Sequence, residues 1–155
     1  MNKLASLALL GALLVPATVI SSAPAHAKPT PKKAPKVNWQ PSYWAAQKAA
    51  KRSGKPLFID FYTDWCGPCK YLDQTTYRDA KFAAYSRGWI MVKVNPEKSE
   101  FGRKLFDKYG LNGYPSMVFT DGAGKKHGEA VGAYPADMLM AEMKKAEKKA
   151  GGIRA

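Results

Sequence analysis

Two runs of mostly apolar residues, PLFIDFY at 56–62 and WIMVKVN at 89–95, restrict the possible folds of this chain more than any other feature. Short runs of this kind are typical of strands that are buried on both faces. A sheet with such strands needs a helical layer on each side to cover it. The two runs therefore predict a covered, mostly parallel sheet.

The segments between and after these runs have helical features. Ser42 and Ser99 are suitable N-caps, and Gly54 and Gly110 stand where helices commonly end. The turn DGAG predicts a hairpin. The expected order is a helix at 42–52, a strand at 56–62, helices at 70–77 and 79–86, a strand at 89–95, a helix at 99–109, strands at 116–120 and 126–132, and a helix at 136–150.

This order predicts an α/β fold with a central mixed sheet, helices on both faces and an N-terminal helix. Strands that are separated by helices favour parallel pairing, and the final hairpin adds an antiparallel strand.

The first 27 residues have the organisation of a secretory signal peptide. Lys3 precedes an apolar stretch at 4–20, and small residues lead to Ala25-His26-Ala27. A membrane-spanning anchor is the alternative, but Pro16 interrupts the stretch, which is also short for a bilayer. We expect cleavage after Ala27 and a periplasmic or secreted mature protein.

Composition divides the remaining chain. Residues 28–38 are rich in Pro and Lys and predict an extended linker, 39–150 form one domain, and 151–155 form a flexible tail. Loss of Lys3 lowers the formal charge from +13 to +12, with much of the excess near the two ends. Export and the lack of a groove-reading motif argue against nucleic acid, whereas a weak attraction to a membrane surface or an acidic partner stays open. A monomer is the default expectation.

The only two cysteines, Cys66 and Cys69, lie in DWCGPCK. A structural disulfide would close a loop too short to constrain the unfolded chain much. Covalent haem needs a histidine after the second cysteine, where Lys70 stands. A structural zinc site needs four ligands, and His127 lies beside the predicted turn as an ordinary exposed residue. Two thiolates could still carry a soft ion such as Cu(I), so copper handling remains an alternative.

Thiol-disulfide chemistry fits the position of the pair best. A buried strand leads directly into a helix here, which places Cys66 at the helix N-terminus, where the backbone N–H groups and the helix dipole stabilise a thiolate. We therefore expect Cys66 to be the exposed nucleophile. Cys69, one turn further on, would be the resolving thiol, and Pro68 suits an early helical position.

The motif WCGPCK after an apolar strand resembles the active site of the thioredoxin family. Asp60, six residues before Cys66, and Lys93 in MVKVN match the family's buried aspartate and its lysine partner. GYPSMVF resembles the segment with the family's cis-proline, here Pro115. No cofactor is implied.

The resemblance implies a role for each matching residue. Asp60 would accept the proton of Cys69, unless it forms only a structural pair with Lys93. Substrate would bind around Trp65, Gly67 and Pro68, and a cis bond at Pro115 would present the Tyr114 backbone to an extended substrate strand.

The chain departs from thioredoxins at Gln74, where the family usually has proline. It is more similar to exported thioredoxin-like proteins related to the C-terminal domain of the transmembrane thiol:disulfide interchange reductase. This implies a membrane thiol reductase as electron donor. The expected function is an exported dithiol reductase that acts on protein disulfides. A disulfide oxidase or isomerase, and a non-catalytic copper-handling or assembly module, are the alternatives.

Overall fold

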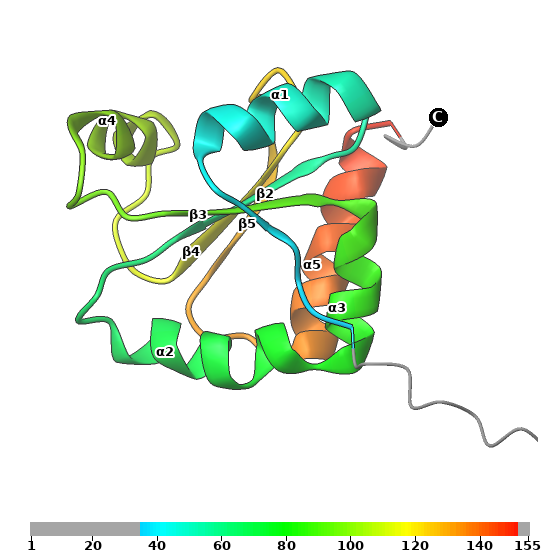
Figure 1. The fold of residues 1–155 in the computed structure, drawn as a ribbon, viewed down its shortest axis with the longest axis horizontal. Coiled ribbons are helices and arrows are strands. Elements are labelled where there is room, and N and C mark those ends of the chain that lie inside the picture. The colour runs from blue at the N-terminus through cyan, green and yellow to red at the C-terminus, as the bar shows by residue number, and fades with distance from the viewer. Residues whose placement is uncertain (1–34, 152–155) are drawn as a thin grey trace, which may run out of the picture. The chain divides into compact units, whose positions relative to one another are not determined.

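A five-stranded sheet forms the centre of the domain in the computed structural model, which describes residues 35–151 (Figure 1). The strand order is β1-β3-β2-β4-β5. The strands are β1 (Trp39–Gln40), β2 (Leu57–Phe61), β3 (Ile90–Val94), β4 (Ser116–Thr120) and β5 (Lys126–Val131). The α/β fold with a mixed sheet is confirmed, and β1 is a short strand that the sequence did not predict.

The direction of β4 corrects the expectation of parallel pairing. β3 pairs in parallel with both β1 and β2, but β4 runs antiparallel to β2 as well as to β5. Ser116, the first residue of β4, pairs with Phe61, the last residue of β2. The chain thus begins β4 level with the C-terminal end of β2. The segment through helix α4 (Glu100–Lys108) does not carry the chain back to the level where β2 begins, as a parallel pairing would require.

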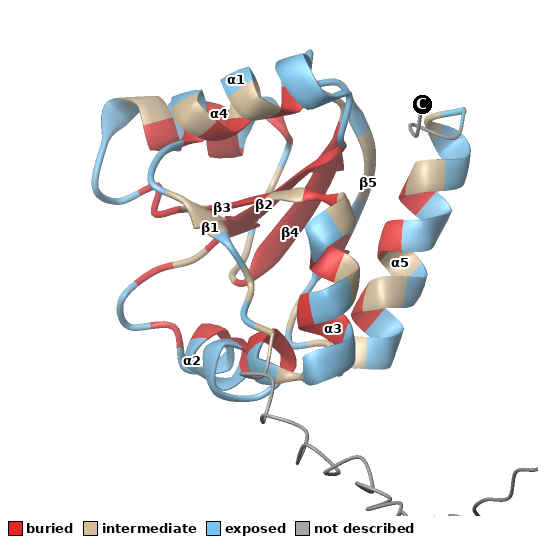
Figure 2. Ribbon diagram, turned by 45° about the vertical axis from the view of Figure 1, so that its right-hand side comes forward, coloured by how far each residue is buried: buried red, intermediate tan, exposed pale blue. Residues whose placement is uncertain are grey.

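Helices cover both faces of the sheet. α1 (Tyr43–Ser53) and α4 lie on one side, and α2 (Gly67–Gln74), α3 (Ala80–Tyr85) and α5 (Ala136–Lys149) lie on the other (Figure 1). Leu57, Ile59 and Phe61 of β2 pack with the first pair of helices, and Phe58 packs with the second group. Alternate side chains of β2 therefore belong to two apolar clusters, which explains why this mostly apolar strand is buried along its whole length (Figure 2).

The N-cap residues and terminal glycines predict most helix ends correctly. The Ser42 and Ser99 hydroxyls accept hydrogen bonds from Ala45 and Gly102, and Gly54 and Gly110 have φ angles of 66° and 68°. The helix expected at 70–77 is instead α2, which ends at Gln74, followed by a separate 3-10 turn, η1 (Thr76–Arg78).

The expected signal peptide, residues 28–34 of the linker and residues 152–155 of the tail lie outside the described residues. Within 35–38 there is no regular secondary structure, and Val37 packs against the apolar cluster around Phe58. No helix in the described part of the chain is both long and apolar enough to cross a bilayer.

Candidate active site

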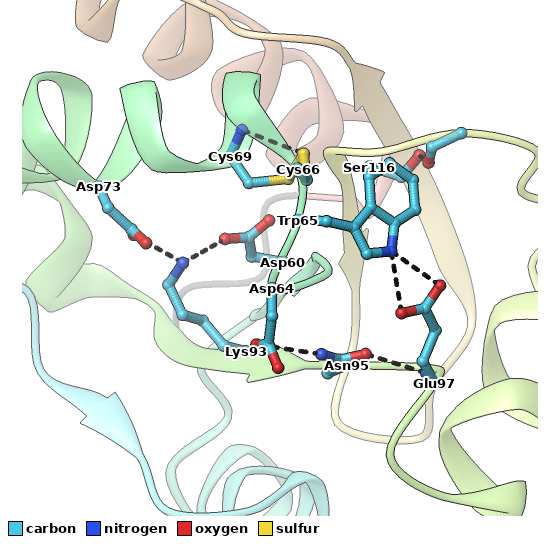
Figure 3. The surroundings of a disulfide bond; sticks show 11 residues. Asp60, Asp64, Trp65, Cys66, Cys69, Asp73, Lys93, Asn95, Glu97 and Ser116 are labelled. Carbon is cyan, nitrogen blue, oxygen red and sulfur yellow. Dashed lines mark hydrogen bonds and ion pairs between the residues drawn. A yellow bond between two sulfur atoms is a disulfide. The ribbon is translucent and has the colours of Figure 1, made fainter.

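The two cysteines occupy the junction between β2 and α2 (Figure 3). They form a disulfide with an S–S distance of 2.05 Å. Cys66 is the N-cap of α2, and its sulfur accepts a hydrogen bond of 3.1 Å from the backbone N–H of Cys69. Pro68 lies in the first turn, where its missing N–H leaves no helical bond unmade. The fold thus directs one backbone N–H of the helix N-terminus at the Cys66 sulfur.

Both cysteines are buried in this oxidised state. Cys66 is 2% exposed and Cys69 3%, so the expectation of an exposed Cys66 is wrong. The disulfide and the Cys69 N–H hold the Cys66 sulfur against the first turn of α2, away from solvent. Gly67 and Pro68, between the cysteines, are exposed.

Trp65 borders the disulfide as a surface residue that is 67% exposed. Its indole Nε1 donates to both carboxylate oxygens of Glu97, each at 3.1 Å. Its ring meets the ring of Tyr114 edge-on at a centroid distance of 5.9 Å. The Tyr114–Pro115 peptide bond is cis, as the family resemblance implies. The structure thus brings Trp65, the residue before Cys66, into contact with Tyr114 of the cis-proline segment.

A buried charged pair lies behind the disulfide. Asp60 and Lys93 are direct partners in the parallel ladder of β2 and β3, and Lys93 Nζ donates to Asp60 Oδ2 at 2.9 Å. The same ammonium lies 2.7 Å from Oδ1 of Asp73 on α2. Figure 3 shows the Asp60 carboxyl between Lys93 and the disulfide. Lys93 therefore pairs with both the buried carboxylate of Asp60, which is 1% exposed, and the carboxylate of Asp73, which is 49% exposed.

Aromatic rings surround the Lys93 ammonium. Its Nζ lies 5.2 Å from the ring centroid of Trp39, and 5.0 Å from those of Tyr62 and Tyr77. Such contacts favour a protonated lysine. Burial alone would lower the pKa of Lys93, but the charges of Asp60 and Asp73 outweigh it and raise the pKa. Lys93 is thus a stable positive charge within the site.

Burial raises the pKa of Asp60, although the charge and hydrogen bond of Lys93 act in the opposite direction. The balance leaves the Asp60 carboxyl a weaker acid than an ordinary aspartic acid. A carboxyl of this kind accepts a proton more readily than an ordinary aspartate does, which suits a group that takes a proton from a thiol.

Sequence reasoning missed several residues around the site. Asp73 follows Cys69 by four residues, so its helical spacing could have identified it. Glu97, and the Asp64–Lys98 ion pair at 2.9 Å, join the loop after β3 to the loop before α2. They come from separate parts of the sequence, so no local pattern points to them.

No group of three or more His, Cys, Asp or Glu side chains within 35–151 is arranged to hold a metal ion. His127 is not the exposed residue that the sequence suggested, because its side chain is 12% exposed and lies 3.1 Å from Asp121 Oδ2. The Asp121 carboxylate also accepts the N–H groups of Ala123 and Lys125, which fixes the hairpin turn next to the histidine.

Comparison with known proteins gives three relevant similarities. Protein disulfide isomerase-like 5-3 of Oryza sativa subsp. japonica is 38% identical over 63% of this chain and 22% of that protein. Thiol:disulfide interchange protein DsbD of Ralstonia nicotianae is 29% identical over 65% of this chain and 17% of that protein. The chain therefore matches only about a fifth of the length of these two relatives.

The oxidised C-terminal domain of Neisseria meningitidis DsbD has a similar structure, with a TM-score of 0.57, 24% identity, and coverage of 66% of this chain and 90% of that domain. At this identity the similarity shows a common fold. The family model of the thioredoxin-like domain matches residues 43–147, which include every residue described around the disulfide except Trp39. The chain belongs to the thioredoxin-like domain family and is related to the DsbD thiol:disulfide interchange proteins.

Proposed function

We propose that this protein is an exported dithiol reductase of protein disulfides. The observation that carries the proposal is a Cys66–Cys69 disulfide at the N-terminus of α2 with the proton-accepting Asp60 behind it. The reduced protein begins the reaction when the Cys66 thiolate attacks a substrate disulfide. One substrate sulfur joins Cys66 in a mixed disulfide, and the other leaves as a thiolate that takes up a proton.

The second step resolves the mixed disulfide. Cys69 attacks the Cys66 sulfur, its thiol proton passes to Asp60, and the second substrate sulfur leaves and is protonated. The substrate has gained two electrons, and the protein holds the Cys66–Cys69 disulfide. Lys93 keeps its proton throughout, and its charge limits the cost of ionising Asp60 before each transfer.

The surface around the disulfide would bind the substrate. Trp65 offers an exposed aromatic face that Glu97 and Tyr114 hold in place, and Gly67 and Pro68, between the cysteines, are exposed beside it. An extended substrate segment would lie along Tyr114 and Pro115. Backbone pairing of this kind recognises many sequences, which suits a reductase with several protein clients.

The direction of electron flow is the part of the proposal that one measurement decides. Because the intervening Gly67-Pro68 is that of thioredoxin, we expect a reduction potential below about −220 mV, towards the thioredoxin value of about −270 mV. Equilibration with glutathione or thioredoxin, followed by quantification of both redox forms, would measure it. A value near the −120 mV of the strongest periplasmic oxidant would reject a reductase and favour an oxidase.

Insulin reduction separates turnover from binding. The wild-type protein should reduce insulin with a dithiol as electron source, and Cys66→Ser should be inactive. A wild-type protein without a thiol-dependent rate would favour a copper-handling or assembly module.

Export and the electron donor complete the proposal. Cleavage after Ala27 would give a mature N-terminus at Lys28, which N-terminal sequencing of the protein from an extracytoplasmic fraction would reveal. The relationship to DsbD supports a membrane thiol reductase as donor. We expect the protein to act as a monomer.

A further inference from the structure

Two buried polar atoms in the charged cluster around Lys93 lack a hydrogen-bond partner among the described residues, as does Thr63 Oγ1 in the loop before the cysteines. Asp60 uses Oδ2 to accept from Lys93, but its Oδ1 accepts no hydrogen bond. The hydroxyl of Tyr77, a residue that is 5% exposed, also forms no hydrogen bond of normal geometry. Buried polar atoms rarely lack a hydrogen-bond partner. Two such atoms in one cluster therefore indicate that they interact with each other in some state of the protein.

The two groups lie in the same charged cluster. Lys93 Nζ is 2.9 Å from Asp60 Oδ2 and 5.0 Å from the ring centroid of Tyr77. The hydroxyl is close enough to act on the carboxyl as a donor and to lower its pKa, although the two groups do not form a well-aligned hydrogen bond in the oxidised form. A small movement, or a single bridging water, would complete the bond.

A pocket lies beside this cluster. It has a volume of 460 Å³, and its lining includes Trp39, Asp73 and Tyr77. It lies between the chain before β1 and the α2–η1 segment, so its lining includes neither cysteine.

We infer that Tyr77 is a positioning residue for Asp60, and that its hydroxyl donates to Oδ1, directly or through one water, when the carboxyl is ionised. This inference rests on the proposed proton transfer from Cys69. Oδ1 is the oxygen that Lys93 leaves free, so it is also the one available for that proton. The phenol stabilises the carboxylate before transfer and turns away, or loses its bridging water, once Oδ1 carries the proton.

Other titratable groups also affect the pKa of Asp60, so the test must distinguish the effect of Tyr77 from theirs. Lys93 on β3 lowers the pKa of Asp60, Asp73 on α2 raises it, and Cys69 exchanges the proton. The Tyr77 phenol itself stays neutral, because burial and the neighbouring Asp60 raise its pKa well above the usual value. Tyr77 therefore acts as a donor.

The test compares Tyr77→Phe with the matched control Tyr71→Phe. The first substitution keeps the ring that contacts Trp39, Phe58 and Phe82 and removes only the hydroxyl. The second removes an exposed hydroxyl from α2. Carboxyl ¹³C NMR of the oxidised protein would follow the titration of Asp60 in each variant and needs no enzymatic activity.

Loss of a donor to an ionised group should move the Asp60 titration to higher pH by about one pH unit in Tyr77→Phe. Tyr71→Phe should match the wild type. An Asp60 titration that is the same in Tyr77→Phe and the wild type would overturn the inference. In the wild type, the Tyr77 ¹³Cζ resonance should also shift at the pH where Asp60 titrates; a resonance that does not respond would overturn it without any variant.

Kinetics then distinguish this inference from the proposed function. A mixed disulfide of Cys66 with 5-thio-2-nitrobenzoate releases that chromophore when Cys69 attacks. The rate should rise with pH as Asp60 ionises, and Tyr77→Phe should move this rise to higher pH together with the NMR titration. If only the NMR titration moves, Tyr77 still positions Asp60, but the proton transfer to Asp60 in the proposed function is rejected.

Discussion

Asp60 brings a charge into the apolar interior at a cost to stability. Its raised pKa means that the folded protein binds a proton more tightly than the unfolded chain does. The contribution of Asp60 to stability is therefore most favourable at low pH, and it is lost as the pH rises through the folded-state pKa. Each pH unit between the two pKa values corresponds to about 1.4 kcal/mol.

Asp60→Asn should consequently stabilise the oxidised protein at pH 7 and above. The amide is neutral, and Lys93 keeps Asp73 as a partner at 2.7 Å, so no charge is left unpaired. Urea unfolding at several pH values measures the effect. The advantage of Asp60→Asn over the wild type should grow with rising pH and disappear in acid; an advantage that is constant across pH would contradict a raised Asp60 pKa.

Individual site residues differed in how far the sequence could predict them. Asp60 and Lys93 sit in two apolar strands that pair in register, so their pairing follows from the strand pattern together with the family resemblance. Tyr77 could only be recognised in three dimensions, because an apolar ring in a helical segment is normally a packing residue. Its unpaired hydroxyl becomes visible once Asp60 and Lys93 lie beside it.

At the scale of helices and strands, N-caps and terminal glycines were reliable because they act within one turn of the chain. The direction of β4 could not be predicted in this way, since it depends on the path of the chain from α4 back to the sheet. Parallel pairing is the usual result when a helix separates two strands, and no residue near β4 in the sequence indicates that this strand is antiparallel. β1 was missed because two residues give too short a pattern.

The contact between the β4–β5 turn and α1 gives a prediction for this scale. A Cβ at Gly122 would lie 2.8 Å from the backbone N of Lys51 and 3.0 Å from the backbone C of Ala50. The obstacle is backbone, which cannot rotate away as a side chain can. Gly122→Ala should therefore lower the free energy of unfolding by about 1–3 kcal/mol.

Gly113→Ala is the matched control, because a Cβ there would have no neighbour within 4 Å. Its stability should stay within about 1 kcal/mol of the wild type or rise slightly. Thermal or urea unfolding of both variants measures the difference. Equal stability of the two variants would mean that the turn can move away from α1 without cost.

For the molecule as a whole, the redox state and the stability of the fold are linked through one thermodynamic cycle. A reductase has a disulfide that is harder to reduce in the folded protein than in the unfolded chain, so oxidation must stabilise the fold. A difference of 30 mV between the two potentials corresponds to about 1.4 kcal/mol.

The oxidised protein should therefore unfold at a higher urea concentration than the reduced protein. An oxidase would show the reverse order, because its reduced form is the more stable one. Cys66→Ser serves as the control, since its unfolding should be the same with and without reductant. This comparison tests the direction of electron flow without any substrate.

The enclosure of the Lys93 ammonium has a consequence for how the protein responds to its surroundings. Three rings and two carboxylates belonging to the protein occupy much of the neighbourhood of this charge, and the Asp60 carboxylate is only 1% exposed, so dissolved ions have little access to the Lys93–Asp60 pair. Dissolved ions weaken attraction between charges on the surface much more than attraction inside the protein. We therefore expect a change in ionic strength to weaken attraction between charges on the surface while leaving the attraction between Lys93 and Asp60 almost unchanged.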